Sequence, residues 1–75
     1  MSAVSSNNSK NAIAKNVRRF WQEKGISQDR LSKLADLSLN TVVNIEAGGN
    51  RNPTIETLTK IANALDVKVD DLIKS

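Results

Sequence analysis

The chain of 75 residues has no cysteine, no histidine and no tyrosine, and its only aromatic residues are Phe20 and Trp21. The lack of cysteine excludes disulfides, thiolate zinc sites and cysteine nucleophiles. The lack of histidine removes the usual acid or base at neutral pH and restricts metal ligands to oxygen. We therefore expect a protein that is not an enzyme and that needs no metal ion or small-molecule cofactor.

Long apolar runs are also missing. No stretch approaches the ~20 apolar residues that a membrane helix needs, and no signal-peptide pattern is present. We therefore expect no membrane partner and a cytoplasmic location. An apolar content of 39% suffices for one compact core, which the scarcity of aromatic residues predicts to be aliphatic. The net charge of +3 is compatible with a polyanionic partner but is also common in small domains.

The first residues, Met1 to Ser9, form a polar tract with a single aliphatic side chain. Such a tract buries too little surface to offset its ordering entropy. We therefore expect a flexible tail over residues 1–11 and one domain over residues 12–75. A DNA-reading arm is disfavoured, because minor-groove arms carry arginine and this tract has none.

Apolar spacing predicts five helices and no strand, which makes an all-α domain. The first helix runs from about Ala12 to Lys24 and stops at Gly25. Its apolar stripe includes both Phe20 and Trp21, so core packing is favoured for these rings over stacking on bases.

Residues 27–47 predict two short helices joined by a tight turn. Ser27 and Ser38 are suitable N-caps, and Asp36 between the helices tolerates a left-handed backbone conformation. The side chains expected to face the core are Leu31, Leu34, Ala35, Val42 and Ile45.

The second helix of this pair, about residues 38–47, has an unusual exposed face. A solvated helix normally carries Glu, Lys and Arg. This face instead carries amides, a hydroxyl and aliphatic groups, from Leu39, Asn40, Thr41, Val43 and Asn44. Asparagine is a mediocre helix former but can bond adenine through two atoms, so contact with bases is favoured over a plain solvated surface.

A loop rich in Gly, Asn and Pro then leads to Thr54, the predicted cap of a fourth helix that ends at Asp66. Its expected core stripe is Ile55, Leu58, Ile61, Ala62 and Leu65. A short final helix has more apolar surface than one side buries easily, and we expect a dimer interface there, formed by Val69, Leu72 and Ile73.

These motifs, in order, resemble the Cro/repressor-type (xenobiotic-response-element) helix-turn-helix family from Ile13 to Ile73. The matching segments are Val17-Arg18, Lys24-Gly25-Ile26-Ser27-Gln28, Leu34-Ala35, Leu37-Ser38, Ile45-Glu46, Arg51-Asn52-Pro53, Ile61-Ala62 and Ala64-Leu65. The resemblance implies the five-helix repressor DNA-binding domain. It also implies a transcriptional regulator that binds a palindromic operator in double-stranded DNA as a homodimer, with residues 38–47 in the major groove.

The resemblance also assigns roles to single positions. It implies base contacts from Leu39, Asn40 and Asn44. It implies contacts to the DNA backbone from Ser27, Gln28, Thr41, Gly49, Asn50 and Arg51, with the amides of the loop gripping phosphates.

One departure from the family concerns Glu46. Trp21 replaces a basic residue that pairs with this glutamate in some members, so that ion pair is not expected here. Glu46 is expected to be structural, bonding to backbone amides or to Arg18.

One alternative stays open: a protein-interaction module of the same fold, antitoxin-like or coactivator-like, whose main partner is a protein. Salt separates the two hypotheses, because DNA affinity falls steeply with salt concentration and a packed protein interface responds weakly. If the chain is a DNA-binding regulator, we expect a bacterial or phage-encoded protein associated with the nucleoid.

Overall fold

The computed structural model describes residues 12–50 and 52–74, and this part of the chain is all-helical. Five helices follow one another, and they are α2 (Ala12–Lys24), α3 (Gln28–Leu34), α4 (Leu39–Glu46), α5 (Ile55–Leu65) and α6 (Val69–Ile73). The predicted fold class is therefore confirmed. The flexible tail predicted over residues 1–11 lies outside the described residues, as does Arg51.

Side-chain oxygens begin three of the helices. Ser27 Oγ accepts a hydrogen bond from the Arg30 N–H group at 3.1 Å, and Ser38 Oγ accepts one from Thr41 at the same distance. Thr54 begins α5 in the same way. Each bond satisfies one of the backbone donors that a helix leaves unpaired at its start. The three predicted caps are therefore confirmed.

Left-handed residues end the helices or turn the chain between them. Gly25 has a φ of 74°, Asp36 of 58° and Asp66 of 59°. Asp66 caps α5, and its N–H group donates to the carbonyl of Asn63. Asp36 thus holds the left-handed conformation that the sequence predicted, and Asp66 holds the same conformation; glycine would meet no Cβ penalty at either position.

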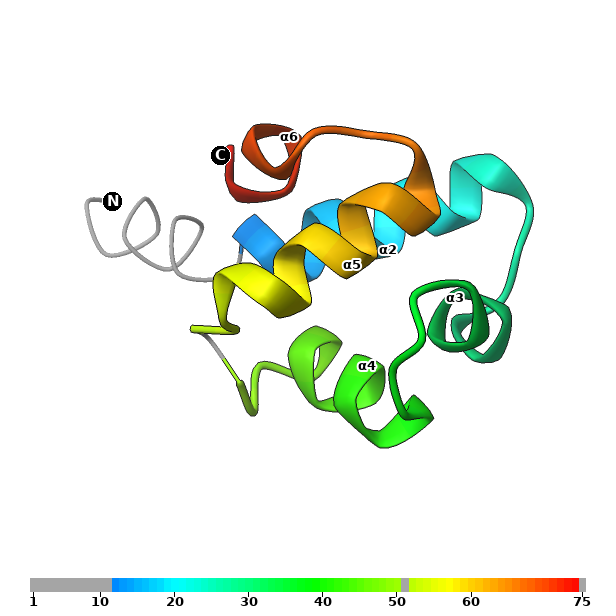
Figure 1. Ribbon diagram of the computed structural model, residues 1–75, viewed down its shortest axis with the longest axis horizontal. Coiled ribbons are helices and arrows are strands. Elements are labelled where there is room, and N and C mark those ends of the chain that lie inside the picture. Colours follow the sequence, from blue (N-terminus) through cyan, green and yellow to red (C-terminus); the bar gives the residue numbers. More distant parts are fainter. Residues whose placement is uncertain (1–11, 51, 75) are drawn as a thin grey trace, which may run out of the picture.

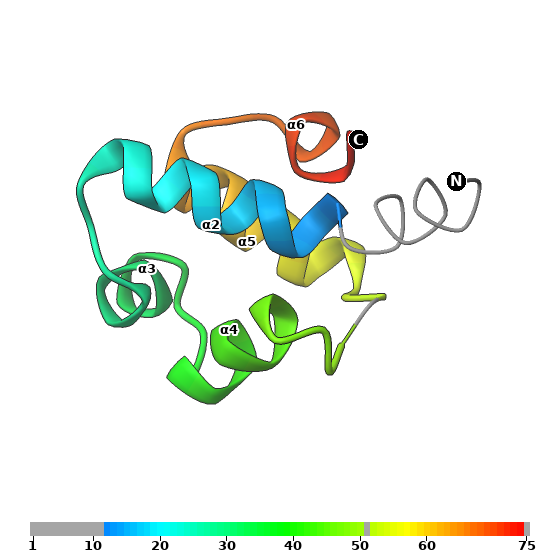
Figure 2. The same ribbon diagram turned by 180° about the vertical axis from the view of Figure 1, so that it is seen from behind.

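The core lies between α2 and α5, which run side by side in the middle of the molecule (Figure 1). The α6 helix covers one side of this pair, and α3 with α4 covers the other, as the reverse view also shows (Figure 2). The core side chains are aliphatic, as predicted, and are those of Val17, Leu31, Ala35, Val42, Ile45, Leu58, Ile61, Ala62, Leu65 and Leu72.

Two predicted core residues are exposed instead. Leu34 is 48% exposed and Ile55 is 71% exposed. Leu34 is the last residue of α3 and Ile55 is the first residue of α5, so each lies at the end of its apolar stripe. Ser32 takes the buried place in α3, and its hydroxyl donates to the Asp29 carbonyl at 2.7 Å, so it enters the core without an unpaired polar group.

A buried amide joins the two ends of the domain. Asn16, on α2, donates from Nδ2 to the carbonyls of Leu72 at 2.9 Å and Lys74 at 2.6 Å. These carbonyls end α6 and have no partner within that helix. Nothing in the apolar periodicity pointed to this contact.

The start of α6 has its own charged cap. The carboxylate of Asp71 accepts a hydrogen bond from the Lys68 N–H group at 3.1 Å and forms an ion pair with Lys74. The backbone bond first, and then the Lys74 ammonium, hold the pKa of Asp71 below its ordinary value. None of the helices within residues 12–50 and 52–74 has the length and apolar character needed to cross a membrane.

Candidate nucleic-acid interface

The exposed face of α4 is as the sequence predicted. Val42 and Ile45 are buried at 0% and 2% exposure, which turns the other sides of the helix outward. Leu39 is 42% exposed and Val43 38% exposed, and both asparagines, Asn40 and Asn44, are exposed. The α4 helix lies along one edge of the molecule, on the side away from α6 (Figure 1).

This face carries no charged side chain, because the only charged residue of α4 is its last, Glu46, and that side chain is 2% exposed. The surface offers two amides, which both donate and accept hydrogen bonds, and two aliphatic side chains. That combination matches the edges of base pairs in a major groove, where adenine presents an acceptor and a donor and thymine presents a methyl group.

The first turn of α4 places its hydroxyl groups together. Thr41 Oγ1 lies 2.8 Å from Ser38 Oγ, and Thr41 is half-buried. Each hydroxyl has one donor, and only one of the two is used between them, so this pair can still donate a hydrogen bond to a phosphate oxygen. The α3 helix packs against α4; its N-cap Ser27 is exposed and its first residue, Gln28, is half-buried.

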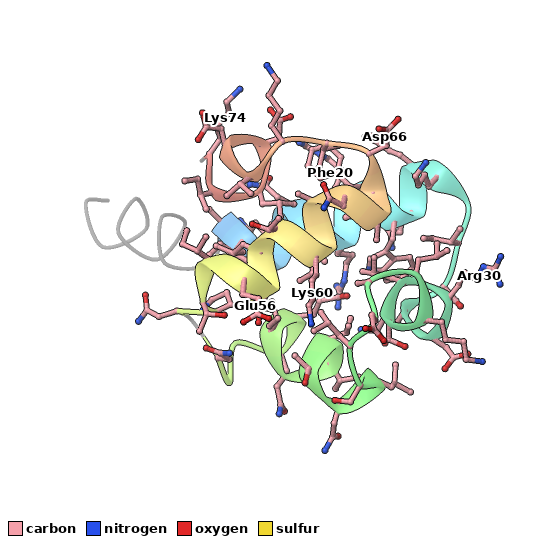
Figure 3. The ribbon with its side chains drawn as sticks, viewed as in Figure 1. Phe20, Arg30, Glu56, Lys60, Asp66 and Lys74 are labelled. Carbon is pink, nitrogen blue, oxygen red and sulfur yellow. The ribbon has the colours of Figure 1, made fainter. Side chains whose placement is uncertain are left out.

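The charged side chains labelled in Figure 3 all lie outside α4. Arg30 extends from α3 into solvent, while Lys74 and Asp66 lie on the opposite side of the molecule from α4 (Figure 3). On α5, Lys60 and Glu56 face each other with their charged atoms 3.9 Å apart. Of these groups, Arg30 lies on α3, one of the helices that pack against α4.

The loop after α4 differs from the expectation. The N–H groups of Gly49 and Asn50 both donate to the Asn44 carbonyl, at 2.9 and 3.3 Å, and that of Asn52 donates to Asn50 Oδ1 at 3.2 Å. The first two amides close the end of α4 and the third bonds within the loop, so all three N–H groups already have partners in the protein and do not point outward as expected. Phosphate contacts at this loop would have to come from the Asn50 side chain and Arg51, and Arg51 lies outside the described residues.

The Gly49 position would accept a side chain. A Cβ at this position would lie 3.5 Å from the Asn44 carbonyl oxygen, an ordinary contact distance, and the positive φ of this loop, 83°, falls on Gly48 instead. Gly49 is therefore not required by the backbone conformation.

Glu46 is structural, as predicted, and it bonds to Arg18. Arg18 Nε lies 3.5 Å from Glu46 Oε1. The sequence missed a second partner, because Trp21 Nε1 donates to Glu46 Oε2 at 2.7 Å. A shallow groove of about 220 Å³ lies beside this contact, lined by Ala14, Lys15, Arg18, Glu46, Ala47 and Gly48.

The predicted dimer surface needs one correction. Leu72 is fully buried in the core, so its side chain offers no surface to a second copy of the chain. Val69 is half-buried against the core, and Ile73 is 48% exposed. Ile55 adds an exposed apolar side chain at the start of α5, and this start and the end of α6 lie at the same end of the molecule in both views (Figures 1 and 2).

Comparison with known proteins finds a family and solved structures with this arrangement. The helix-turn-helix family model matches residues 17–72. The HTH-type transcriptional regulator SinR of Bacillus subtilis is 31% identical over 61 residues, which cover 81% of this chain and 55% of SinR. An uncharacterized HTH-type transcriptional regulator of Sinorhizobium fredii, y4dJ, is 33% identical over 61 residues, or 78% of its length.

Among solved structures, the chain is similar to the restriction-modification controller protein C.AhdI of Aeromonas hydrophila. The TM-score is 0.77 at 30% sequence identity, covering 84% of this chain and 94% of that one. The chain spans about half the length of SinR.

Proposed function

The chain belongs to the Cro/repressor-type helix-turn-helix family, and on this premise we propose that it is a sequence-specific DNA-binding transcriptional regulator. The relatives named as transcriptional regulators and as a controller protein support this proposal. The observation that carries it is the exposed face of α4, which presents two amides and two aliphatic side chains and no charge.

In this proposal α4 enters the major groove. Asn40 and Asn44 bond base edges, adenine being the base that an amide reads through two atoms, and Leu39 contacts a thymine methyl group. The start of α3, with Ser27 and Gln28, contacts the DNA backbone. The remaining backbone contacts come from Thr41, Asn50 and Arg51, whereas the Gly49 N–H group is held by the Asn44 carbonyl.

We also propose that the operator is palindromic and that two copies of the chain bind it. Two recognition helices related by a two-fold axis fit successive major grooves when they lie about 34–36 Å apart. Ile73 and Val69 supply the contact between the copies, and Ile55 lies at the same end of the molecule. The location consistent with this role is the cytoplasm, on the nucleoid.

In vitro selection from a library of random duplexes tests the proposal. We expect the wild-type protein to enrich a palindrome, and its affinity for that duplex to fall with log salt at a slope near −0.9 for each phosphate neutralised. Failure to enrich any sequence would contradict the proposal. Binding that is insensitive to salt would favour the protein-interaction alternative.

A further inference from the structure

The contact between Trp21 and Glu46 joins the long helix α2 to the last residue of α4. The Glu46 side chain is 2% exposed, so its carboxylate has given up most of its contact with water. A carboxylate in that position requires hydrogen-bond donors in the protein. The Trp21 indole and Arg18 both donate to it.

The two donors are unequal. The indole N–H group lies 2.7 Å from Glu46 Oε2, a distance typical of charge-assisted hydrogen bonds. Arg18 Nε lies 3.5 Å from Glu46 Oε1, and its side chain is 60% exposed, so that pair is long and screened by water. The neutral indole is therefore the principal partner of the buried carboxylate.

This bond acts on a helix that needs an external constraint. The α4 helix has eight residues, too few to be stable alone. Val42 and Ile45 anchor it through apolar contacts, which are not directional. A hydrogen bond is directional, so the bond to Trp21 fixes where the end of the helix lies and how the helix is rotated.

The same end of α4 carries a proposed base-reading residue. Asn44 lies two residues before Glu46, and its carbonyl accepts the N–H groups of Gly49 and Asn50. A shift of Glu46 would thus move Asn44 and the following loop together. We propose that Trp21 is a positioning residue, which sets the orientation of the DNA-reading face of α4 through its hydrogen bond to Glu46. The inference rests on the proposed function and deepens it.

Trp21→Phe tests the inference, since it removes the N–H donor and keeps an aromatic ring. Arg18→Gln is the matched control for the weaker donor. The probes are the duplex enriched by the wild-type protein and a shuffled duplex of the same length and composition. Affinities for both duplexes are measured at a temperature well below the midpoint of thermal unfolding of each variant, so that only folded protein is compared.

We expect Trp21→Phe to lower the ratio of the two affinities roughly two- to thirtyfold, the range in which residues coupled to a site without touching its ligand act. The affinity for the shuffled duplex should stay unchanged, and Arg18→Gln should lower the ratio less than Trp21→Phe does. In a Glu46→Ala background, Trp21→Phe should not lower the affinity ratio further, because the carboxylate that accepts the Trp21 hydrogen bond is already absent.

A folded Trp21→Phe variant with the wild-type affinity ratio would overturn the inference and leave the proposed function intact. Failure of the wild-type protein to enrich any duplex would overturn both. If Trp21→Phe does not fold, hydrogen exchange of the indole proton in the wild-type protein tests the inference instead. Protection comparable to that of the α4 amides supports the inference, and exchange as fast as that of a solvated indole contradicts it.

Discussion

At the scale of single residues, two polar contacts join parts of this domain that lie far apart in the sequence. Asn16 binds the end of α6 and Trp21 binds the end of α4, so α2 holds both of these short helices. Among the described residues, no buried side-chain nitrogen or oxygen lacks a hydrogen-bond partner. Neither contact was predicted, because a hydrogen bond between residues more than twenty positions apart leaves no periodic signal in a single sequence.

The first prediction concerns Asn16. Replacement by alanine leaves the carbonyls of Leu72 and Lys74 without their donor in a mostly buried place, so the free energy of unfolding should fall by about 1–3 kcal/mol. Urea denaturation measures this change. The control is Asn63→Ala on the exposed side of α5, expected within about 0.5 kcal/mol of wild type. Equal losses in the two variants would show that the two bonds contribute little.

The second prediction concerns the base-reading residues. Asn40→Ala or Asn44→Ala should each cost on the order of 1–3 kcal/mol of binding free energy at one base pair of each half-site and relax the preference there. The thermal midpoint should barely change, because both side chains are exposed. Binding measured across single-base variants of the enriched duplex checks this. A uniform loss on every sequence would assign the residue to the DNA backbone instead.

At the scale of helices, the capping residues in the sequence predicted well where helices begin, whereas the apolar stripes predicted less well which side chains are buried. Ser27, Ser38 and Thr54 cap their helices as expected, since a cap depends only on residues within one turn. Burial depends on what lies opposite a residue, which one sequence does not contain. This is why Leu34 and Ile55 continue an apolar stripe and are nevertheless exposed.

The third prediction uses the two left-handed aspartates. Asp36→Gly and Asp66→Gly should each be neutral or raise the free energy of unfolding by up to roughly 1 kcal/mol, because glycine adopts a φ near 60° without strain. Chemical denaturation of each variant measures the change. A clear loss of stability in either would show that the aspartate side chain contributes a cap of its own.

At the scale of the whole molecule, four of the five exposed large apolar side chains among the described residues lie in two places, and the fifth, Leu34, ends α3. Leu39 and Val43 lie on the proposed DNA-reading face of α4, while Ile55 at the start of α5 and Ile73 at the end of α6 lie on helix ends at the same end of the molecule. The sequence predicted the first group through its chemistry. It predicted only part of the second group, since Leu72 is buried and Ile55 is exposed. In a helix as short as α6, packing against the neighbouring helices sets which side faces the core.

The fourth prediction concerns the second group. Ile73→Asp should weaken self-association in sedimentation experiments and reduce cooperative binding to a full palindrome, while the monomer still folds, because a charge replaces a half-exposed apolar side chain. Leu34→Asp, equally exposed at 48% but on α3, is the control for self-association. An unchanged dimer in Ile73→Asp would move the interface elsewhere, and Ile55→Asp then tests the start of α5.

The central claim is that the exposed face of α4 reads DNA. Backbone and side-chain amide resonances, followed by NMR as the duplex enriched by the wild-type protein is added, test it most directly. The account predicts the largest shifts in residues 39–44, including the side-chain amides of Asn40 and Asn44, with smaller shifts at Ser27 and Gln28. Shifts concentrated on α2 or on the outer side of α5, with α4 unperturbed, would contradict it.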